Sequence, residues 1–141
     1  MASKSVQLDN LKKVSIFAGC SKRELQHIAK AGDVFTMTVG PVFVDQGQMG
    51  REAFVILDGD VIVRRGGRKI TSLGAGEVVG ELSLLDHGPR TASAICDGDC
   101  TLFVLDQRHF RQVLEEQPAI SFKLLGTLAG HIRDLDRQYF G

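Results

Sequence analysis

The sequence has no net charge, no long apolar run and few cysteines or histidines. Lysine plus arginine and aspartate plus glutamate each number 17 among 141 residues. This balance gives no overall basic field for nucleic acid or for a membrane surface. The chain has no run of about 18 apolar residues, and residues 1–7 lack the apolar centre of a signal peptide. We therefore expect a cytoplasmic protein that contacts neither a membrane nor nucleic acid directly.

The cysteines are too few and too scattered for a disulfide framework. Cys20, Cys96 and Cys100 are odd in number, and we expect buried free thiols. Cys96 and Cys100 could also face each other across a hairpin at the Asp97-Gly98-Asp99 turn. The three separated cysteines do not resemble an iron–sulfur site, and no metal or cofactor is expected.

The length and the 43% hydrophobic content allow one core and leave no room for a second domain. Ser21 and Glu24 fit a capping box, and the apolar spacing predicts a helix from Ser21 to Ala31 that ends at Gly32. A short apolar helical piece at residues 11–17 is expected to dock against the next part of the chain. The helical segment of the domain thus spans about residues 11–31.

Residues 33–106 alternate short apolar runs with glycine and aspartate turns, which is typical of a β-sandwich or β-roll. Hairpin turns are predicted at Asp58-Gly59-Asp60 and at Arg65-Gly66-Gly67-Arg68. Eight strands suffice for a jelly roll of two sheets, so we expect a mainly β fold with flanking helices. The predicted strands span residues 34–39, 41–45, 53–57, 61–65, 69–73, 77–79, 92–96 and 101–105.

Two C-terminal helices are predicted within about residues 107–139. Asp106 can cap the first, which ends at Gln117-Pro118. The second carries an apolar stripe that must cover either the β-roll or a second copy of the helix. Gly126 and Gly130 each cost this helix about 1 kcal/mol relative to alanine. They indicate close packing against a neighbour, or a marginal helix that a ligand can order or move. The stripe consists of Ile120, Leu124, Leu128, Ile132, Leu135 and Tyr139.

Residues 80–94 have the features of a pocket for a phosphate and a sugar. A strand should end at Gly80, where a short helix begins, and the amides of Leu82 and Ser83 then have no intrahelical acceptor and can face an anion. Glu81 would repel a phosphate and is better explained as the acceptor for a sugar hydroxyl. Arg90 would grip two phosphate oxygens. The alternative is a surface ion pair between Glu81 and Arg90, worth about 0 to 1 kcal/mol.

These residues resemble the phosphate-binding cassette of cyclic nucleotide-binding domains of the catabolite-activator and protein-kinase-A regulatory type. The match consists of Gly80-Glu81-Leu82-Ser83-Leu84, with Arg90 and Thr91-Ala92 following, and a strand–turn–strand at residues 54–61 extends it. The resemblance implies that Glu81 takes the ribose 2′-hydroxyl. It also implies that Arg90 and nearby backbone groups of Leu82, Ser83 and Thr91 take the cyclic phosphate.

The resemblance further implies a base pocket and a moving C-terminal helix. Val63, Ile70 and Leu73 match positions that line the base pocket, and Leu135 and Asp136 fall nearest the base edge. Thr91 is compatible with either base, and we favour cyclic AMP over cyclic GMP. The expected function is a non-catalytic receptor that signals through residues 119–139, to an unidentified protein partner or by forming a homodimer through that helix. The chain ends near where related transcription factors begin a helix-turn-helix domain, so direct DNA reading is not expected.

Three other functions fit the sequence less well. The glycines at 74, 76 and 80 suggest a dinucleotide fingerprint, but the third comes one position too late and no parallel βαβ unit follows. A cupin-like enzyme would need clustered histidines and a carboxylate, whereas the four histidines are isolated. An interaction scaffold that has lost its ligand is disfavoured by the intact Glu81 and Arg90.

Overall fold

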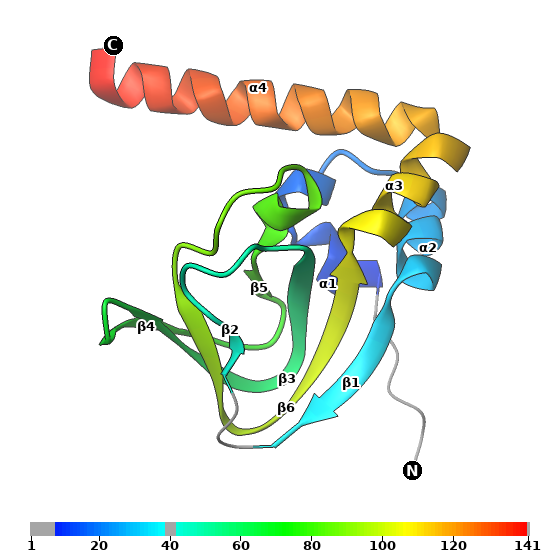
Figure 1. Ribbon diagram of the computed structural model, residues 1–141. Coiled ribbons are helices and arrows are strands. Elements are labelled where there is room, and N and C mark those ends of the chain that lie inside the picture. The colour runs from blue at the N-terminus through cyan, green and yellow to red at the C-terminus, as the bar shows by residue number, and fades with distance from the viewer. Residues whose placement is uncertain (1–7, 39–41, 141) are drawn as a thin grey trace.

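The computed structural model describes residues 8–38 and 42–140. Figure 1 shows a β-roll at the centre of the molecule. Helices from both ends of the chain form a layer on one side of it, and an exposed hairpin extends from the opposite side. The elements are α1 Leu8–Lys12, η1 Ser15–Phe17, α2 Lys22–Ala31, β1 Asp33–Met37, β2 Val42–Val44, β3 Glu52–Arg65, β4 Arg68–Leu73, β5 Val78–Val79, η2 Glu81–Leu84, β6 Ser93–Asp106, α3 Gln107–Glu116 and α4 Pro118–Phe140.

The described residues form six strands, so the prediction of eight is wrong. The predicted strands at 53–57 and 61–65 are one strand, β3, and those at 92–96 and 101–105 are one strand, β6. All pairings are antiparallel, in the order β1-β6-β3-β4, with β2 also on β6 and β5 also on β3. Positions 39 and 41, at the ends of two predicted strands, lie outside the described residues.

The predicted hairpin at Asp58-Gly59-Asp60 is a bulge within β3. Asp58 pairs with Thr101 and Asp60 with Asp97, and the register shifts on both sides of Asp58. Gly59 has φ +95° and Gly98, in the facing part of β6, has φ +93°. A glycine with positive φ serves a tight hairpin and a bulge equally well, which explains the error. The other predicted hairpin is confirmed, because Arg65 pairs with Arg68 around Gly66-Gly67.

The predicted N-terminal helix is confirmed as α2. Ser21 Oγ accepts from the Glu24 amide at 3.2 Å, and the Glu24 carboxylate accepts from the Ser21 amide at 2.7 Å. Burial would raise the pKa of Glu24, but its hydrogen bonds to Lys123 and Ser21 outweigh burial and lower it. Lys123 belongs to α4, so this ion pair joins the two ends of the chain.

Buried apolar side chains form two groups. The first lies between the helical layer and the roll and includes Leu11, Ile16, Phe17, Ile28, Phe103, Phe110, Ile120 and Leu124. The second fills the roll itself and includes Val44, Phe54, Ile56, Val61, Cys96, Cys100 and Leu102. The three cysteines are free and buried, as predicted. Burial, and then the contact with Cys100, raises the pKa of Cys96 to about 12.

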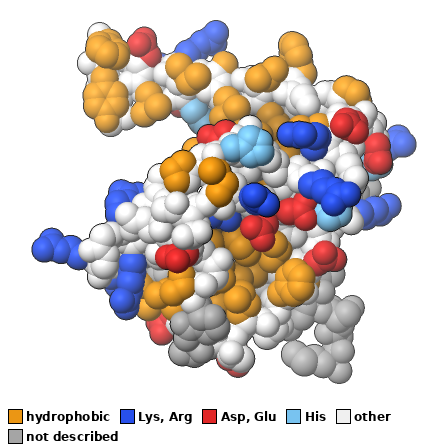
Figure 2. Space-filling model, in the orientation of Figure 1, with side chains coloured by type: hydrophobic (Ala, Val, Ile, Leu, Met, Phe, Trp, Pro, Cys, Tyr) orange, Lys and Arg blue, Asp and Glu red, His pale blue; other side chains and the backbone are white. Residues whose placement is uncertain are grey.

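Helix α4 is packed along only its first half. Ile120 and Leu124 are buried, whereas Ile132, Leu135 and Tyr139 are 66%, 54% and 70% exposed. In Figure 1 the helix continues past the roll, and in Figure 2 hydrophobic side chains are spread along it. The predicted stripe therefore covers the core with one half and leaves the other half open in this chain.

The glycines of α4 do not mark close packing within the described chain. A Cβ added at Gly126 or Gly130 would meet no atom within 4 Å, so the packing explanation is wrong for contacts inside the chain. No helix that the structure describes has the length and apolarity needed to cross a membrane. Among the described residues, 8–38 and 42–140, no group of three or more His, Cys, Asp or Glu side chains is placed to hold a metal ion.

Candidate functional site

The cassette begins at Gly80, directly after β5 ends at Val79. Gly80 has φ +76° and caps η2, so the predicted strand-to-helix junction is confirmed. The short helix is a 3-10 helix, with the Ser83 amide donating to the Gly80 carbonyl at 3.0 Å. The expectation that the Ser83 amide lacks an intrahelical acceptor is therefore wrong, because 3-10 bonding supplies acceptors one residue earlier than α-helical bonding.

The loop after η2 is held by the loop between β2 and β3. The Arg90 amide donates to the Gln48 carbonyl at 2.7 Å, and the Gly47 amide donates to the Arg90 carbonyl at 2.9 Å. Gln107, the first residue of α3, donates its side-chain amide to the Asp86 carbonyl at 2.9 Å. Hydrogen bonds to both the amide and the carbonyl of Arg90 thus fix its backbone, independently of its side-chain contacts.

The Arg90 side chain is buried and held by three groups. Its Nη1 donates to Ser83 Oγ at 2.9 Å, and Nη2 lies 3.9 Å from a Glu52 carboxylate oxygen. Its Cζ lies 5.8 Å from the centre of the Phe54 ring, within cation–π range. Burial lowers the pKa of Arg90 and Glu52 opposes this, but a guanidinium stays charged in either case. The side chain, which is only 7% exposed, therefore carries a fixed positive charge at the pocket wall.

Two glycines make room for this guanidinium. A Cβ at Gly80 would collide with Arg90 Nη1, and a Cβ at Gly50 would collide with Ser83 Oγ and come within 3.1 Å of Arg90 Nε. In this structure the group that approaches the Gly80 backbone closely is Arg90. Gly50 was not among the residues predicted for the site.

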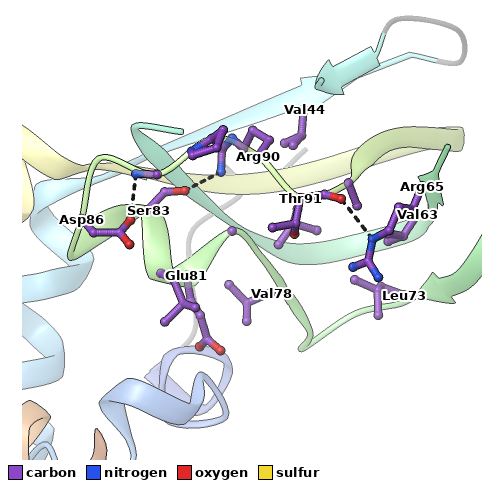
Figure 3. Close-up of a pocket in the computed structure, with 16 residues that line it drawn as sticks. Val44, Val63, Arg65, Leu73, Val78, Glu81, Ser83, Asp86, Arg90 and Thr91 are labelled. Atoms are coloured by element: carbon purple, nitrogen blue, oxygen red, sulfur yellow. Dashed lines mark hydrogen bonds between the residues drawn. The ribbon is translucent and has the colours of Figure 1, made fainter. Parts of the chain in front are cut away.

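Glu81 does not face Arg90. Figure 3 shows its side chain directed away from Arg90, toward the N-terminal segment. Ser15 Oγ donates to its two carboxylate oxygens at 3.3 and 3.4 Å. The alternative of a Glu81–Arg90 ion pair is not formed, since the carboxylate near Arg90 is that of Glu52.

The cassette borders a pocket of about 400 Å³, within the range of roughly 300–1,000 Å³ that holds small ligands. Arg90 lies at one end, and Val63 and Leu73 lie at the other, where the guanidinium of Arg65 is also present, as Figure 3 shows. The lining is formed by Val44, Val63, Arg65, Leu73, Val78, Val79, Gly80, Glu81, Leu82, Ser83, Asp86, Gly88, Pro89, Arg90, Thr91 and Ala92.

All seven predicted cassette residues line this pocket, as do Val63 and Leu73 of the predicted base site. Ile70, Leu135 and Asp136 lie outside its lining. Ile70 is half exposed on β4, and Leu135 and Asp136 lie on the exposed half of α4. Nucleotide contact by any of these residues stays a prediction, and for the last two it requires a different position of α4.

Several residues of the site were not predicted, among them Arg65, Glu52 and Ser15. Arg65 lines the pocket, and its Nε donates to the Thr91 carbonyl at 3.1 Å. It follows Val63 by two positions in β3, so strand periodicity could have identified it. Glu52 and Ser15 come from distant segments, and no local pattern indicates them.

Comparison with known proteins shows which family the chain belongs to. The family model described as "Cyclic nucleotide-binding domain" matches residues 37–117. The chain is 35% identical over 101 residues to the Cyclic AMP receptor protein of Thermus thermophilus, covering 68% of this chain and 46% of that protein. It is 30% identical over 132 residues to a cAMP-dependent protein kinase regulatory subunit of Mycosarcoma maydis, covering 91% of this chain and 24% of the relative. The chain thus spans less than half of these curated relatives.

Solved structures show the same fold. The N-terminal domain of a transcriptional regulator from Streptomyces coelicolor A3(2) superposes with a TM-score of 0.86 at 26% identity, covering 94% of this chain and 95% of that one. The Thermus thermophilus Catabolite Activator Protein superposes with a TM-score of 0.70 at 29% identity, covering 88% of this chain and 61% of that one. With a family model that matches more than half of its length, the chain belongs to the cyclic nucleotide-binding domain family.

Proposed function

We propose that this chain is a single, non-catalytic regulatory domain of the cytoplasm that binds a cyclic nucleotide, with cyclic AMP favoured over cyclic GMP. The observation that carries the proposal is the buried Arg90 guanidinium at one end of the 400 Å³ pocket. A fixed cation in a small cavity favours an anionic ligand, and the apolar side chains of Val63 and Leu73 at the opposite end favour contact with an aromatic base. The names of the relatives from Thermus and Mycosarcoma support cyclic AMP.

The residues present suit each part of such a ligand. The cyclic phosphate would take the Arg90 donors that Ser83 and Glu52 now occupy. Glu81 would accept from the ribose hydroxyl after its side chain turns toward the pocket. Val63 and Leu73 would pack against the base.

The output of the domain would be the position of α4. Its first half is anchored at Ile120 and Leu124, whereas Leu135 and Asp136 are free of the core. We propose that the nucleotide favours a position of α4 in which these two residues reach the base edge. A ligand shifts such an equilibrium only by its differential affinity for the two positions, so bound nucleotide and α4 position must be coupled.

The exposed half of α4 would pair with a second copy of this chain. Leu125, Ile132, Leu135 and Tyr139 are exposed and recur at spacings of seven, three and four, which are seam positions of a two-stranded coiled coil. In a parallel pair, His131 flanks the seam of one helix and faces Asp136 of the other. This complementary pair favours a second copy as the occupant, and a further protein partner would bind the resulting dimer.

Calorimetric titration with cyclic AMP and then with cyclic GMP tests the function. The expected result is saturable binding of both, tighter for cyclic AMP, with an increase in melting temperature that grows with ligand concentration. AMP, which lacks the cyclic phosphate, is the matched control and should bind more weakly. Absence of heat and of a thermal shift with both cyclic nucleotides would favour the interaction scaffold instead.

A further inference from the structure

The carboxylate proposed to hold the sugar already has an acceptor role elsewhere in the fold. Both oxygens of Glu81 lie within 3.4 Å of Ser15 Oγ, 66 positions earlier in the chain. Figure 3 shows the side chain pointing to the N-terminal segment and away from Arg90. The same carboxylate cannot keep this contact and also turn into the pocket to meet a sugar hydroxyl.

Ser15 is held in place by its neighbours. Val14, Ile16 and Phe17 are each 1% exposed, so η1 is anchored in the core on both sides of the serine. The Phe17 ring lies 5.7 Å from that of Phe110 in α3. The hydroxyl is thus presented from a fixed point, and breaking the contact requires movement of Glu81 and η2.

The same segment borders α4. Gly19, two residues after η1, lies so close to α4 that a Cβ there would come within 3.7 Å of Lys123 Cβ and 3.8 Å of Thr127 Oγ1. The Ser15–Glu81 contact therefore connects the cassette to the part of the helical layer on which α4 rests.

We propose that Ser15 is a positioning residue that competes with the nucleotide for Glu81 and tethers the cassette to the helical layer. Binding of the sugar would break the Ser15–Glu81 contact and release η2 from η1. The proposal rests on the proposed function for the ligand, but the contact itself does not. Its consequence is that the hydroxyl of Ser15 lowers nucleotide affinity although it stabilises the fold.

The test compares Ser15→Ala with the wild type by calorimetric titration with cyclic AMP and by thermal unfolding without added nucleotide. Ser15→Ala should bind cyclic AMP roughly two- to tenfold more tightly, the lower end reflecting the long hydrogen bonds. It should also melt at a lower temperature. A merely structural serine would lower the melting temperature without tightening the binding.

Three variants complete the test. Ser15→Thr keeps the hydroxyl and should retain wild-type affinity. Ser72→Ala, at an exposed serine of β4 outside the pocket, should change neither measurement. In a Glu81→Ala background, Ser15→Ala should no longer lower the melting temperature, because the acceptor is gone.

The outcomes separate the two proposals. If the wild type binds cyclic AMP and Ser15→Ala binds it equally or more weakly, the competition is wrong. If Ser15→Ala lowers the melting temperature equally with and without Glu81, the tether is wrong. If the wild type binds neither cyclic AMP nor cyclic GMP, the proposed function fails, and the competition fails with it.

Discussion

Arg90 lies across Gly80, with its Nη1 in the space that a Cβ at position 80 would need. Gly80 also has φ +76°, a backbone conformation that costs other residues about 1–2 kcal/mol. The backbone and the guanidinium therefore both require glycine at this position. A substitution of Gly80 should therefore have two separate measurable effects, one from backbone strain and one from displacement of Arg90.

Gly80→Ala is expected to lower stability by more than the backbone cost alone and to weaken cyclic AMP binding, because the guanidinium must move. Gly66→Ala is the matched control. Gly66 has φ +60°, but a Cβ there would meet nothing within 4 Å, so it carries the backbone cost without the collision. Chemical unfolding and calorimetry measure the two effects. Equal loss of stability in both variants, with unchanged binding, would show that Arg90 adapts freely.

Arg90→Leu is expected to weaken cyclic AMP binding by at least tenfold. It removes charge-assisted hydrogen bonds worth roughly 1.5–3 kcal/mol each. Arg111→Leu, at an exposed arginine of α3 that does not line the pocket, removes the same charge and should leave the affinity unchanged. Calorimetric titration measures the affinity of both variants for cyclic AMP. Retained affinity in Arg90→Leu would show that the phosphate binds elsewhere.

The N-cap of α3 gives a prediction for acid. Asp106 accepts from the His109 amide at 2.7 Å, and its other oxygen lies 2.6 Å from the His109 ring. Burial would raise the pKa of Asp106, but these hydrogen bonds outweigh burial and lower it. A lowered pKa stabilises the fold above the ordinary aspartate value of about 3.9, and this stability is lost as the pH falls through the folded-state value.

Asp106→Ala is therefore expected to cost about 0.5–2 kcal/mol at neutral pH, and the gap from the wild type should narrow as the pH falls below about 4. Asp106→Asn keeps a capping oxygen, so it should retain most of the stability without this pH dependence. Urea unfolding between neutral pH and pH 3 measures both. A gap that stays constant over this range would mean that the carboxylate charge does not contribute.

Local signals are sufficient to predict part of the fold and of the site. The capping box of α2 and the junction at Gly80 depend on residues within a few positions of each other, and the sequence predicts both. The bulge at Gly59 is indistinguishable from a turn in the sequence, because one backbone conformation serves both. The Ser15–Glu81 contact joins residues 66 positions apart and depends on how the helical layer meets the roll. No pattern along the chain could reveal it.

The exposed half of α4 gives the last prediction. Ile132 is at the centre of the proposed seam and 66% exposed within one chain, so its substitution should hardly affect the fold of the monomer. Ile132→Asp would place an unpaired carboxylate in the interface of a dimer, where it could not be solvated. Sedimentation equilibrium should show a concentration-dependent dimer for the wild type and a monomer for Ile132→Asp.

Arg133→Asp is the control for this experiment, because it introduces the same side chain one position along, off the seam. It should remain a dimer. A dimer that survives Ile132→Asp would have to use another surface, and a wild type that is monomeric at every concentration would leave the apolar half of α4 to a different protein. Because Leu135 and Asp136 lie on this same half, dimerisation of the wild type would compete with nucleotide binding for one helix, and its affinity for cyclic AMP should depend on protein concentration.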